Sequence, residues 1–193
     1  MRGLDMTIRR ATRHDARALA PLINQAGEGL PALIWAGLAA PGQDPWQVGV
    51  SRVESEDAGV SFRNAWVGHV HGKLAGCLLA YRQPDLPEPI PDDAPAMFRP
   101  LLELEAEAPG TGYVYVLATV PEMQGQGVGN RMLEFAERYR GLNGMSLIVS
   151  DANAGARRLY ERHGYAERAT RPMVKDGWQN PGINWVLMVK PAA

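Results

Sequence analysis

Residues 119–132 read TVPEMQGQGVGNRM, and three glycines stand at alternate positions within them: Gly125, Gly127 and Gly129. The run before them, YVYVLATV at 113–120, is rich in β-branched and aromatic residues and predicts a buried strand. From Gly129 to Arg140 the apolar residues recur at helical spacing. The stretch is therefore predicted to join a strand to a helix through a glycine-rich turn.

A helix that begins at these glycines offers a binding site for an anion. Its first backbone N–H groups lack acceptors within the helix, and its start carries partial positive charge. Glycine leaves room for a phosphate because it has no Cβ, and it permits unusual backbone dihedrals. We interpret the stretch as a phosphate cradle. The alternative is a connector whose glycines serve only the geometry of the turn.

The residues around the glycines disfavour two common phosphate ligands. A nucleoside-triphosphate loop has Lys and then Ser or Thr after its last glycine, whereas Asn130 and Arg131 follow Gly129 here. A dinucleotide fold has a third glycine where Asn130 stands, although Asp151 is plausibly placed for its acid. In that fold the strand also turns directly into the glycines, whereas residues 121–124 intervene here.

A third pattern fits the stretch better. Gln124-Gly125-Gln126-Gly127-Val128-Gly129 resembles Gln/Arg-x-x-Gly-x-Gly/Ala, the pyrophosphate-binding motif of the GNAT superfamily of acyl-CoA N-acyltransferases. The later run NAGARRLYERHGY, residues 153–165, is similar to a second box of that family, Asn-x-x-Ala-x-x-Leu-Tyr-x-x-x-Gly-Phe/Tyr. The matching residues of this box are Asn153, Ala156, Leu159, Tyr160, Gly164 and Tyr165. The specific resemblance covers residues 113–165, the expected CoA-binding core.

The resemblance implies a single α/β domain over residues 1–193. Its twisted mixed sheet would have about six to seven strands, helices on both faces, and central parallel strands, 113–120 and 145–150, that splay apart. Other strands are predicted at 6–10, 66–71 and 73–81, and as a C-terminal hairpin of 171–174 and 183–189. Helices are predicted after Thr12, over 30–40, from about residue 96, and after Asn153. Residues 43–60 are not assigned.

The resemblance also implies an activity. An acetyl group would move from acetyl-CoA, the co-substrate, to a primary amine by direct attack in a ternary complex. Backbone groups of Leu117, Ala118 and Thr119 would pair with the pantetheine arm, as an added strand does. The pyrophosphate would be bound by backbone N–H groups of Gln124, Gly125, Gln126, Gly127, Val128, Gly129 and Asn130. Asn153 is expected to bond the pantetheine arm, to cap the helix that follows it, or to do both.

Two catalytic roles follow from the chemistry of the transfer. Tyr160 matches the family's tyrosine near the thioester sulfur and is predicted to protonate the leaving thiolate, although a core aromatic is the alternative. Some family members carry a general-base glutamate near the position of Tyr113, so that carboxylate is not found here. Glu105 and Glu107 are the candidates for the base, and Tyr115 or a water chain would also serve.

Two alternatives to acetyl transfer stay open. One is a catalytically silent module of the same fold that binds or senses acyl-CoA, which the missing strand carboxylate favours. The other is transfer of a longer acyl chain, which depends on the depth of a pocket.

Residues 83–110 form an acidic, proline-rich segment with seven prolines, seven acids and a single Arg99. Its first half is predicted to be irregular, because proline removes a backbone donor and restricts its neighbour. The segment is either a solvated loop or a flap beside a site that attracts cations. A flap favours a small cationic acceptor, such as an amine, a polyamine or a peptide N-terminus.

Composition bounds the remaining classes of function. The net charge of −1 gives no basis for binding nucleic acid or an anionic membrane. The single Cys77 excludes an intramolecular disulfide, and with no histidine at ligand spacing no metal site is predicted. The charged N-terminal residues and the lack of a long apolar window predict a cytoplasmic protein without a signal peptide. A homodimer is a possible assembly, because dimers are common in such folds.

Overall fold

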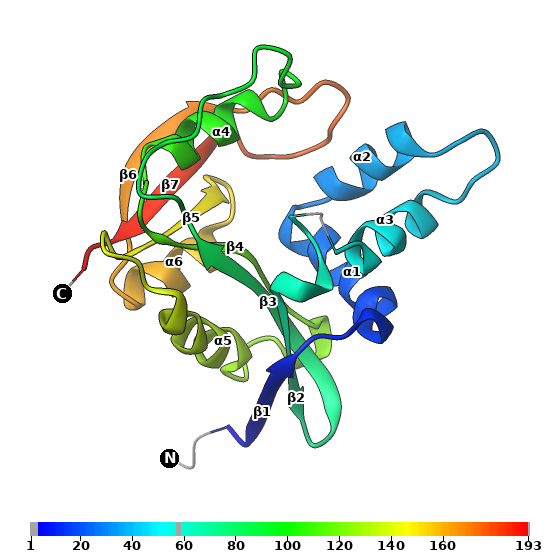
Figure 1. Cartoon of the computed structure of the whole chain (residues 1–193). Helices are drawn as coiled ribbons and strands as arrows, with labels where there is room; N and C mark the ends of the chain where they lie inside the picture. The colour runs from blue at the N-terminus through cyan, green and yellow to red at the C-terminus, as the bar shows by residue number, and fades with distance from the viewer. Residues whose placement is uncertain (1–3, 57–58, 193) are drawn as a thin grey trace. The chain divides into compact units, whose positions relative to one another are not determined.

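The structure, a computed structural model, describes residues 4–56 and 59–192. Figure 1 shows the arrangement of the strands and helices along the chain. The strands are β1 (Met6–Arg10), β2 (Ala65–Val70), β3 (Lys73–Arg82), β4 (Gly112–Thr119), β5 (Met145–Ser150), β6 (Ala166–Pro172) and β7 (Asn184–Lys190). The α-helices are α1 (Ala16–Ala26), α2 (Leu30–Leu38), α3 (Pro45–Glu54), α4 (Arg99–Ala106), α5 (Val128–Ala136) and α6 (Ala154–Arg162).

The predicted α/β class with a mixed sheet is confirmed. The seven strands follow one another in the hydrogen-bonded order β1-β2-β3-β4-β5-β7-β6. β4 and β5 are parallel, whereas the pairs β1–β2, β2–β3, β5–β7 and β7–β6 are antiparallel. Parallel neighbours need a crossover connection, and the chain between β4 and β5 supplies it with α5.

The chain divides into two compact units that are interleaved in sequence. The first unit consists of Met1–Leu79 and Val116–Phe135, and the second of Ala80–Tyr115 and Ala136–Ala193. β3 and β4 therefore each run from one unit into the other. The single domain expected over residues 1–193 stays a prediction, and residues 1–3, 57–58 and 193 of that range lie outside the described residues.

Within the first unit, β2 is covered on both faces. Ala65 and Val67 are fully buried in a cluster with residues of α1 and α3. The ring of Trp66, which points to the other face, lies 4.6 Å between centroids from that of Phe135 in α5. Side chains alternate between the two faces of a strand. One set of β2 side chains therefore packs in the cluster with α1 and α3, and the other set faces α5.

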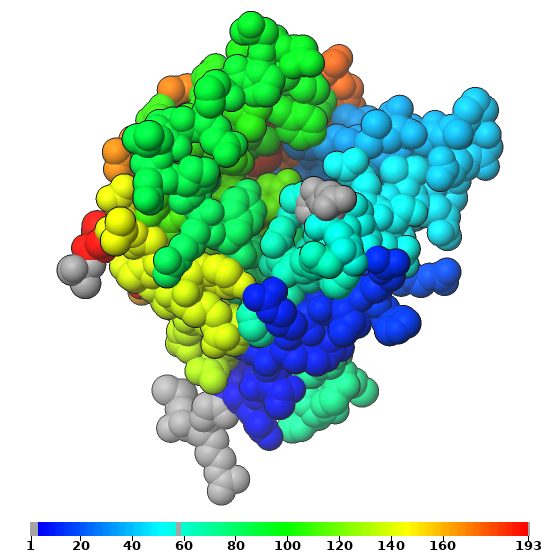
Figure 2. Space-filling view, viewed as in Figure 1, coloured from blue at the N-terminus to red at the C-terminus, as the bar shows by residue number. Residues whose placement is uncertain are grey.

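Within the second unit, α4 lies against β6 and β7. It is the regular part of the acidic segment, whose preceding residues, 83–98, form only turns and bends. Figure 2 shows this segment, in green, at the surface of the molecule. The prediction of an irregular first half and a helical second half is therefore confirmed, with the helix starting at Arg99 rather than near residue 96.

Two predicted elements, and the region that the sequence left unassigned, differ from the structure. The strand expected at 171–174 is Ala166–Pro172 instead, because this edge strand is largely exposed and carries no apolar pattern. The unassigned region contains α3, which begins at Pro45 with the side chain of Asp44 accepting from the Trp46 N–H at 3.0 Å. Asp at the N-cap followed by Pro at the first helical position is a known signal for a helix start. Asp44 and Pro45 form this signal, so the start of α3 could have been predicted from the sequence. The helix expected to reach Arg140 is α-helical only to Ala136, as α5, and continues as a 3₁₀ turn at Glu137–Tyr139.

Candidate active site

The glycine-rich turn lies between β4 and α5, after a short 3₁₀ turn at Pro121–Met123. Gly125 and Gly127 have φ angles of +74° and +91°, in the left-handed region that favours glycine. A Cβ built on either residue would meet no heavy atom within 4 Å. These two glycines therefore serve the turn and also border open space, whereas Gly129 lies within the first turn of α5.

The start of α5 presents backbone donors beside that space. Its first i→i−4 bond runs from the Arg131 N–H to the Gly127 carbonyl at 3.1 Å, so the N–H groups of Val128, Gly129 and Asn130 lie at the helix start, before the ladder of helical hydrogen bonds. The N–H groups of Gln124 and Gln126 make long turn bonds of 3.3 and 3.4 Å to preceding carbonyls. The donors of the predicted cradle are therefore the N–H groups of the helix start and of the turn before it.

The end of β4 is held by the first unit. The Val120 N–H donates to the Ala75 carbonyl of β3 at 2.9 Å, and the Thr119 carbonyl accepts from the Gln25 side chain of α1 at 3.0 Å. Ala118 is buried, and Leu117 and Thr119 are half-buried. A carbonyl has two lone pairs, so the bond from Gln25 leaves Thr119 able to accept a second hydrogen bond.

The predicted parallel pairing of β4 with β5 is confirmed, and it is short. The register consists of Gly112↔Met145, Tyr113↔Ser146 and Val114↔Leu147. β4 has eight residues and β5 has six, so the recorded pairing covers only the first part of each strand.

α6 carries the two predicted site residues of the second box. The Asn153 side-chain oxygen accepts from the Ala156 N–H at 3.1 Å, which confirms the helix-capping role. Tyr160 is buried, with 8% of its surface exposed, and its ring lies 6.0 Å between centroids from that of Tyr165. Burial in an aromatic pair fits the alternative of a core aromatic and is also compatible with an acid that acts in a dry site.

The structure brings a carboxylate to the strand position where the sequence lacks one. The Tyr113 hydroxyl of β4 donates to the Glu105 carboxylate of α4 at 3.2 Å. Burial raises the pKa of Glu105, and the bond from Tyr113 opposes this rise because it favours the charged form. Burial also raises the pKa of Tyr113 well above its ordinary value, so this hydroxyl stays protonated and acts as the donor.

Glu107, the other candidate base, is engaged elsewhere. Arg171 of β6 pairs with Glu103 at 2.9 Å and with Glu107 at 2.5 Å. Residues four apart share one face of a helix, whereas Glu105 lies two positions from each of them and points in another direction. The structure thus separates the two candidates: Glu107 holds α4 to β6, and Glu105 contacts Tyr113.

Sequence analysis did not identify a group of three tyrosines, one of which is the Tyr113 that donates to this carboxylate. The ring of Tyr81, at the end of β3, lies 5.6 Å from that of Tyr113 and 6.1 Å from that of Tyr115. The rings of Tyr113 and Tyr115 are 6.0 Å apart. Tyr113 and Tyr115 are two residues apart on β4 and so share one face of the strand, a signal that the sequence contains. Tyr81 lies on another strand, so only the tertiary structure shows that it joins them.

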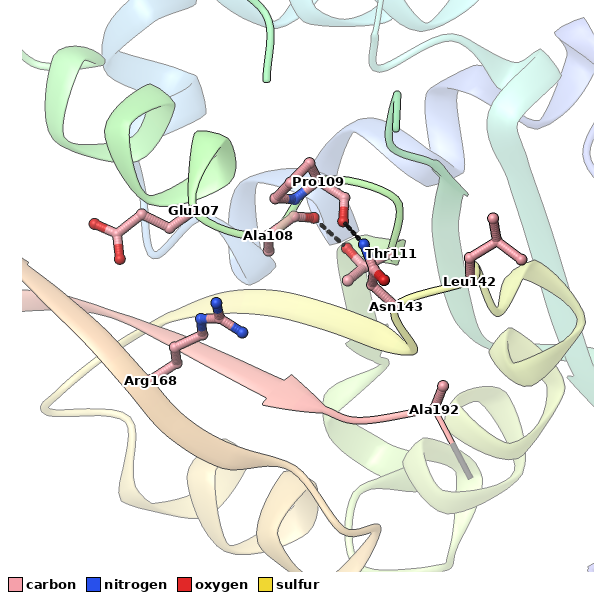
Figure 3. Close-up of a pocket in the computed structure, with 8 residues that line it drawn as sticks. All are labelled: Glu107, Ala108, Pro109, Thr111, Leu142, Asn143, Arg168 and Ala192. Carbon is pink, nitrogen blue, oxygen red and sulfur yellow. Dashed lines mark hydrogen bonds between the residues drawn. The ribbon is translucent and has the colours of Figure 1, made fainter. Parts of the chain in front are cut away.

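A separate pocket in the second unit has a volume of about 460 Å³. Figure 3 shows its lining residues, Glu107, Ala108, Pro109, Thr111, Leu142, Asn143, Arg168 and Ala192. Thr111 and Asn143 donate to the Ala108 and Pro109 carbonyls at 2.7 and 2.8 Å. Arg168 stands at a shift in the β6–β7 register, between Glu167 and Ala169. Of the predicted site residues, only Glu107 is part of this lining.

Metal ligands and membrane spans were also sought. In the described ranges, no group of three or more His, Cys, Asp or Glu side chains is arranged to hold a metal ion. None of the helices in residues 4–56 and 59–192 combines the length and the apolar character needed to cross a membrane.

Comparison with known sequences gives two matches. The family model described as "Acetyltransferase (GNAT) family" matches residues 33–165. A mycothiol acetyltransferase from Beutenbergia cavernae is 35% identical over 77 residues. This alignment covers 38% of the chain and only 26% of the relative, so the chain spans about a quarter of that protein's length.

Two solved structures illustrate the likeness of the fold. One is described as histone acetyltransferase HPA2 and related acetyltransferase from Corynebacterium glutamicum, with 25% identity, a TM-score of 0.61, and 97% of each chain covered. The other is the diaminobutyrate acetyltransferase EctA from Paenibacillus lautus, in complex with L-2,4-diaminobutyric acid and coenzyme A. It has 16% identity and a TM-score of 0.58, with 97% of this chain and 96% of that chain covered.

Proposed function

The chain belongs to the acetyltransferase (GNAT) family, and we propose that it moves an acetyl group from acetyl-CoA to a primary amine by direct attack in a ternary complex. The family uses acetyl-CoA as its co-substrate. One observation carries the proposal for this chain: the open glycine turn at the start of α5, in which Gly125 and Gly127 adopt left-handed dihedrals. The EctA structure, which holds coenzyme A and L-2,4-diaminobutyric acid, has a similar fold.

The residues of the turn fit a diphosphate. The space beside Gly125 and Gly127 is free of heavy atoms within 4 Å of a built Cβ, and the N–H groups of Val128, Gly129 and Asn130 lie at a helix start. Aligned N–H groups and the helix dipole both favour negative charge there. Gln124 to Asn130 are therefore proposed to hold the pyrophosphate, and the backbone of Leu117, Ala118 and Thr119 to hold the pantetheine arm. Asn153 is proposed to bond the same arm while it caps α6.

Replacing Gly127 by alanine should weaken CoA binding about tenfold, which corresponds to about 1.4 kcal/mol. The added Cβ would enter the space proposed for phosphate, and the residue would have to keep a left-handed φ, which costs an L-residue about 1–2 kcal/mol. Calorimetric titration with CoA measures the effect. Gly42→Ala is the matched control, because Gly42 has a φ of +80° and equally open surroundings in the loop between α2 and α3. If Gly127→Ala and Gly42→Ala lose the same amount of CoA affinity, the proposal that the glycine turn binds the pyrophosphate is contradicted.

Acetyl transfer needs a base and an acid, and the second unit supplies a candidate for each. Acetyl-CoA provides a thioester whose carbonyl carbon accepts the nucleophile. Glu105 is proposed to take a proton from the amine, since an alkylammonium with a pKa near 10 cannot attack until it is neutral. Tyr160 is proposed to give a proton to the sulfur as the C–S bond breaks. Glu107, paired with Arg171, is left with the structural role of holding α4.

A catalytically silent acyl-CoA-binding module is the second candidate, because Tyr113 stands where other members carry a carboxylate. An assay of thiol release from acetyl-CoA over a panel of primary amines separates the two functions. We expect release that depends on the amine and yields its N-acetyl derivative. Tight CoA binding without amine-dependent release across the panel would contradict acetyl transfer and support the silent module.

A further inference from the structure

The tyrosine cluster is defined as Tyr81, Tyr113 and Tyr115, and it adjoins the buried side of Glu105. Tyr113 is 3% exposed and anchors the cluster, whereas Tyr115 exposes 42% of its surface to solvent. Tyr81 and Glu105 are half-buried. An aromatic surface that is open at one ring and ends at a carboxylate is thus built entirely within the second unit.

The charges around the cluster are negative. Glu103 and Glu107 both pair with Arg171, so these three side chains together keep a charge of −1 (+1 − 2), whereas the described hydrogen bond of Glu105 comes from the uncharged Tyr113. The charged groups that act on the pKa of Tyr81, after burial, are the acids Glu105 and Glu88. Arg99, the single arginine of the acidic segment, donates to the backbone carbonyls of Pro91 and Asp92. A ligand group at the cluster therefore meets aromatic faces and an unneutralised acid.

We infer that Tyr115 and Tyr81, with Glu105, bind the ammonium group of the acceptor, and that the acceptor is an alkylamine with no carboxylate beside its nitrogen. The faces of tyrosine rings attract cations within about 6 Å of the ring centroid. Glu105 adds a charge-assisted hydrogen bond, and the same acid repels a carboxylate next to the amine. The inference rests on the proposed function and specifies the acceptor of that reaction.

The arrangement also connects binding to chemistry. The ammonium N–H bond would break with its proton passing to the Glu105 carboxylate, which becomes a neutral acid as the amine becomes neutral. The nitrogen lone pair then forms the new C–N bond to the thioester carbonyl carbon, and the C–S electron pair leaves on sulfur, which takes a proton from Tyr160. The nitrogen loses its second proton to restore the one that Tyr160 has given, so the products are the neutral amide and the thiol. No additional reagent is needed. Tyr115 is thus a specificity-determining residue that contacts the substrate before the proton is transferred.

The test compares cadaverine with 2,6-diaminopimelate, which has the same carbon chain between its nitrogens and carries a carboxylate beside each of them. Each is titrated calorimetrically into the full chain in the presence of CoA, for the wild type, Tyr115→Leu and Tyr115→Phe. We expect wild type to bind cadaverine at least tenfold more tightly than 2,6-diaminopimelate. Tyr115→Leu should weaken cadaverine binding about fivefold to thirtyfold, the range of a cation–π contact, and Tyr115→Phe should stay within about twofold because it keeps the ring.

Three results would overturn the ammonium site: no binding of cadaverine to wild type, 2,6-diaminopimelate bound as tightly as cadaverine, or unchanged affinity for cadaverine in Tyr115→Leu. Because Tyr115 is exposed, substitutions there should not unfold the protein. A thermal unfolding midpoint equal to that of wild type verifies that both variants are folded. Thiol release is measured in parallel. Wild type that binds cadaverine as expected but releases no thiol would contradict acetyl transfer and still support the ammonium site.

Discussion

Glu105→Gln should lower kcat by about 10²- to 10⁴-fold, the usual contribution of a general base. Glutamine keeps the size and polarity of the side chain, so it can still accept a hydrogen bond from Tyr113, but it cannot take a proton from the amine. The variant should bind CoA with the affinity of the wild type, because the proposed phosphate cradle lies in residues 124–130. Steady-state turnover with a primary amine, together with calorimetric titration of CoA, measures both effects.

The pH dependence gives a second, independent signature of Glu105. A general base works only when ionised, so the rate of wild type should rise with pH through the pKa of Glu105, which burial raises above that of an ordinary glutamate. In Glu105→Gln, the rise of the rate with pH that is caused by ionisation of Glu105 (the acidic limb of the pH–rate profile) should be absent. Tyr113→Phe removes the donor that stabilises the carboxylate, so the pKa of Glu105 should rise further and the limb should move to higher pH.

Glu103→Gln is the matched control for this prediction. Glu103 lies on the same helix, and its loss leaves Arg171 paired with Glu107. Exposed ion pairs contribute only about 0–1 kcal/mol, so α4 should stay in place and activity should be close to that of wild type. If Glu105→Gln and Glu103→Gln turn over equally well, the base is another group, such as Tyr115 or a water chain.

Tyr160→Phe should reduce kcat by about 10²-fold or more while CoA affinity changes little. The substitution deletes the hydroxyl proposed to protonate the departing sulfur, and general-acid catalysis by one positioned group is worth about 10²- to 10⁴-fold. The ring itself remains, so the packing against Tyr165 is preserved. Single-turnover measurement of thiol release separates the chemical step from product release.

Tyr165→Phe provides the comparison for Tyr160→Phe. Tyr165 is 3% exposed, and its hydroxyl has no hydrogen-bond partner among the described residues. Removing an unsatisfied buried hydroxyl should leave stability unchanged or slightly higher, with activity unaffected. The role of Tyr160 as an acid is wrong if both variants keep wild-type turnover, and in that case Tyr160 is a core aromatic.

Most of the elements were predictable because their signals are local. The hairpin between β2 and β3 turns at His71 and Gly72, whose φ angles of +50° and +75° suit the tight turn that this dipeptide predicts. The strand β4 and the helix α5 follow from one continuous apolar run and one helical stripe. β6 could not be placed correctly, since an exposed edge strand such as AERATRP has no apolar periodicity to read.

The candidate site was predictable only in part. The glycine turn and the box from Asn153 to Tyr165 are contiguous motifs, so they could be found and given roles from the resemblance alone. The choice between Glu105 and Glu107 could not be made, because Glu105 lies on one short acidic helix and Glu107 caps the end of the same helix. Sequence reasoning also noted that the strand position at Tyr113 has no carboxylate, without finding the group that compensates for it.

The sequence by itself determined the α/β class, the glycine turn and the family, because dihedral preference and hydrophobic period are properties of neighbouring residues. The tertiary structure alone decided which acid meets Tyr113 and which tyrosines gather around it. Arg171, more than sixty residues beyond α4, orients that helix by pairing with Glu103 and Glu107 and so leaves Glu105 on another face. Contacts between such distant segments depend on how the helices and strands pack, and the pattern of neighbouring residues in the sequence does not predict that packing.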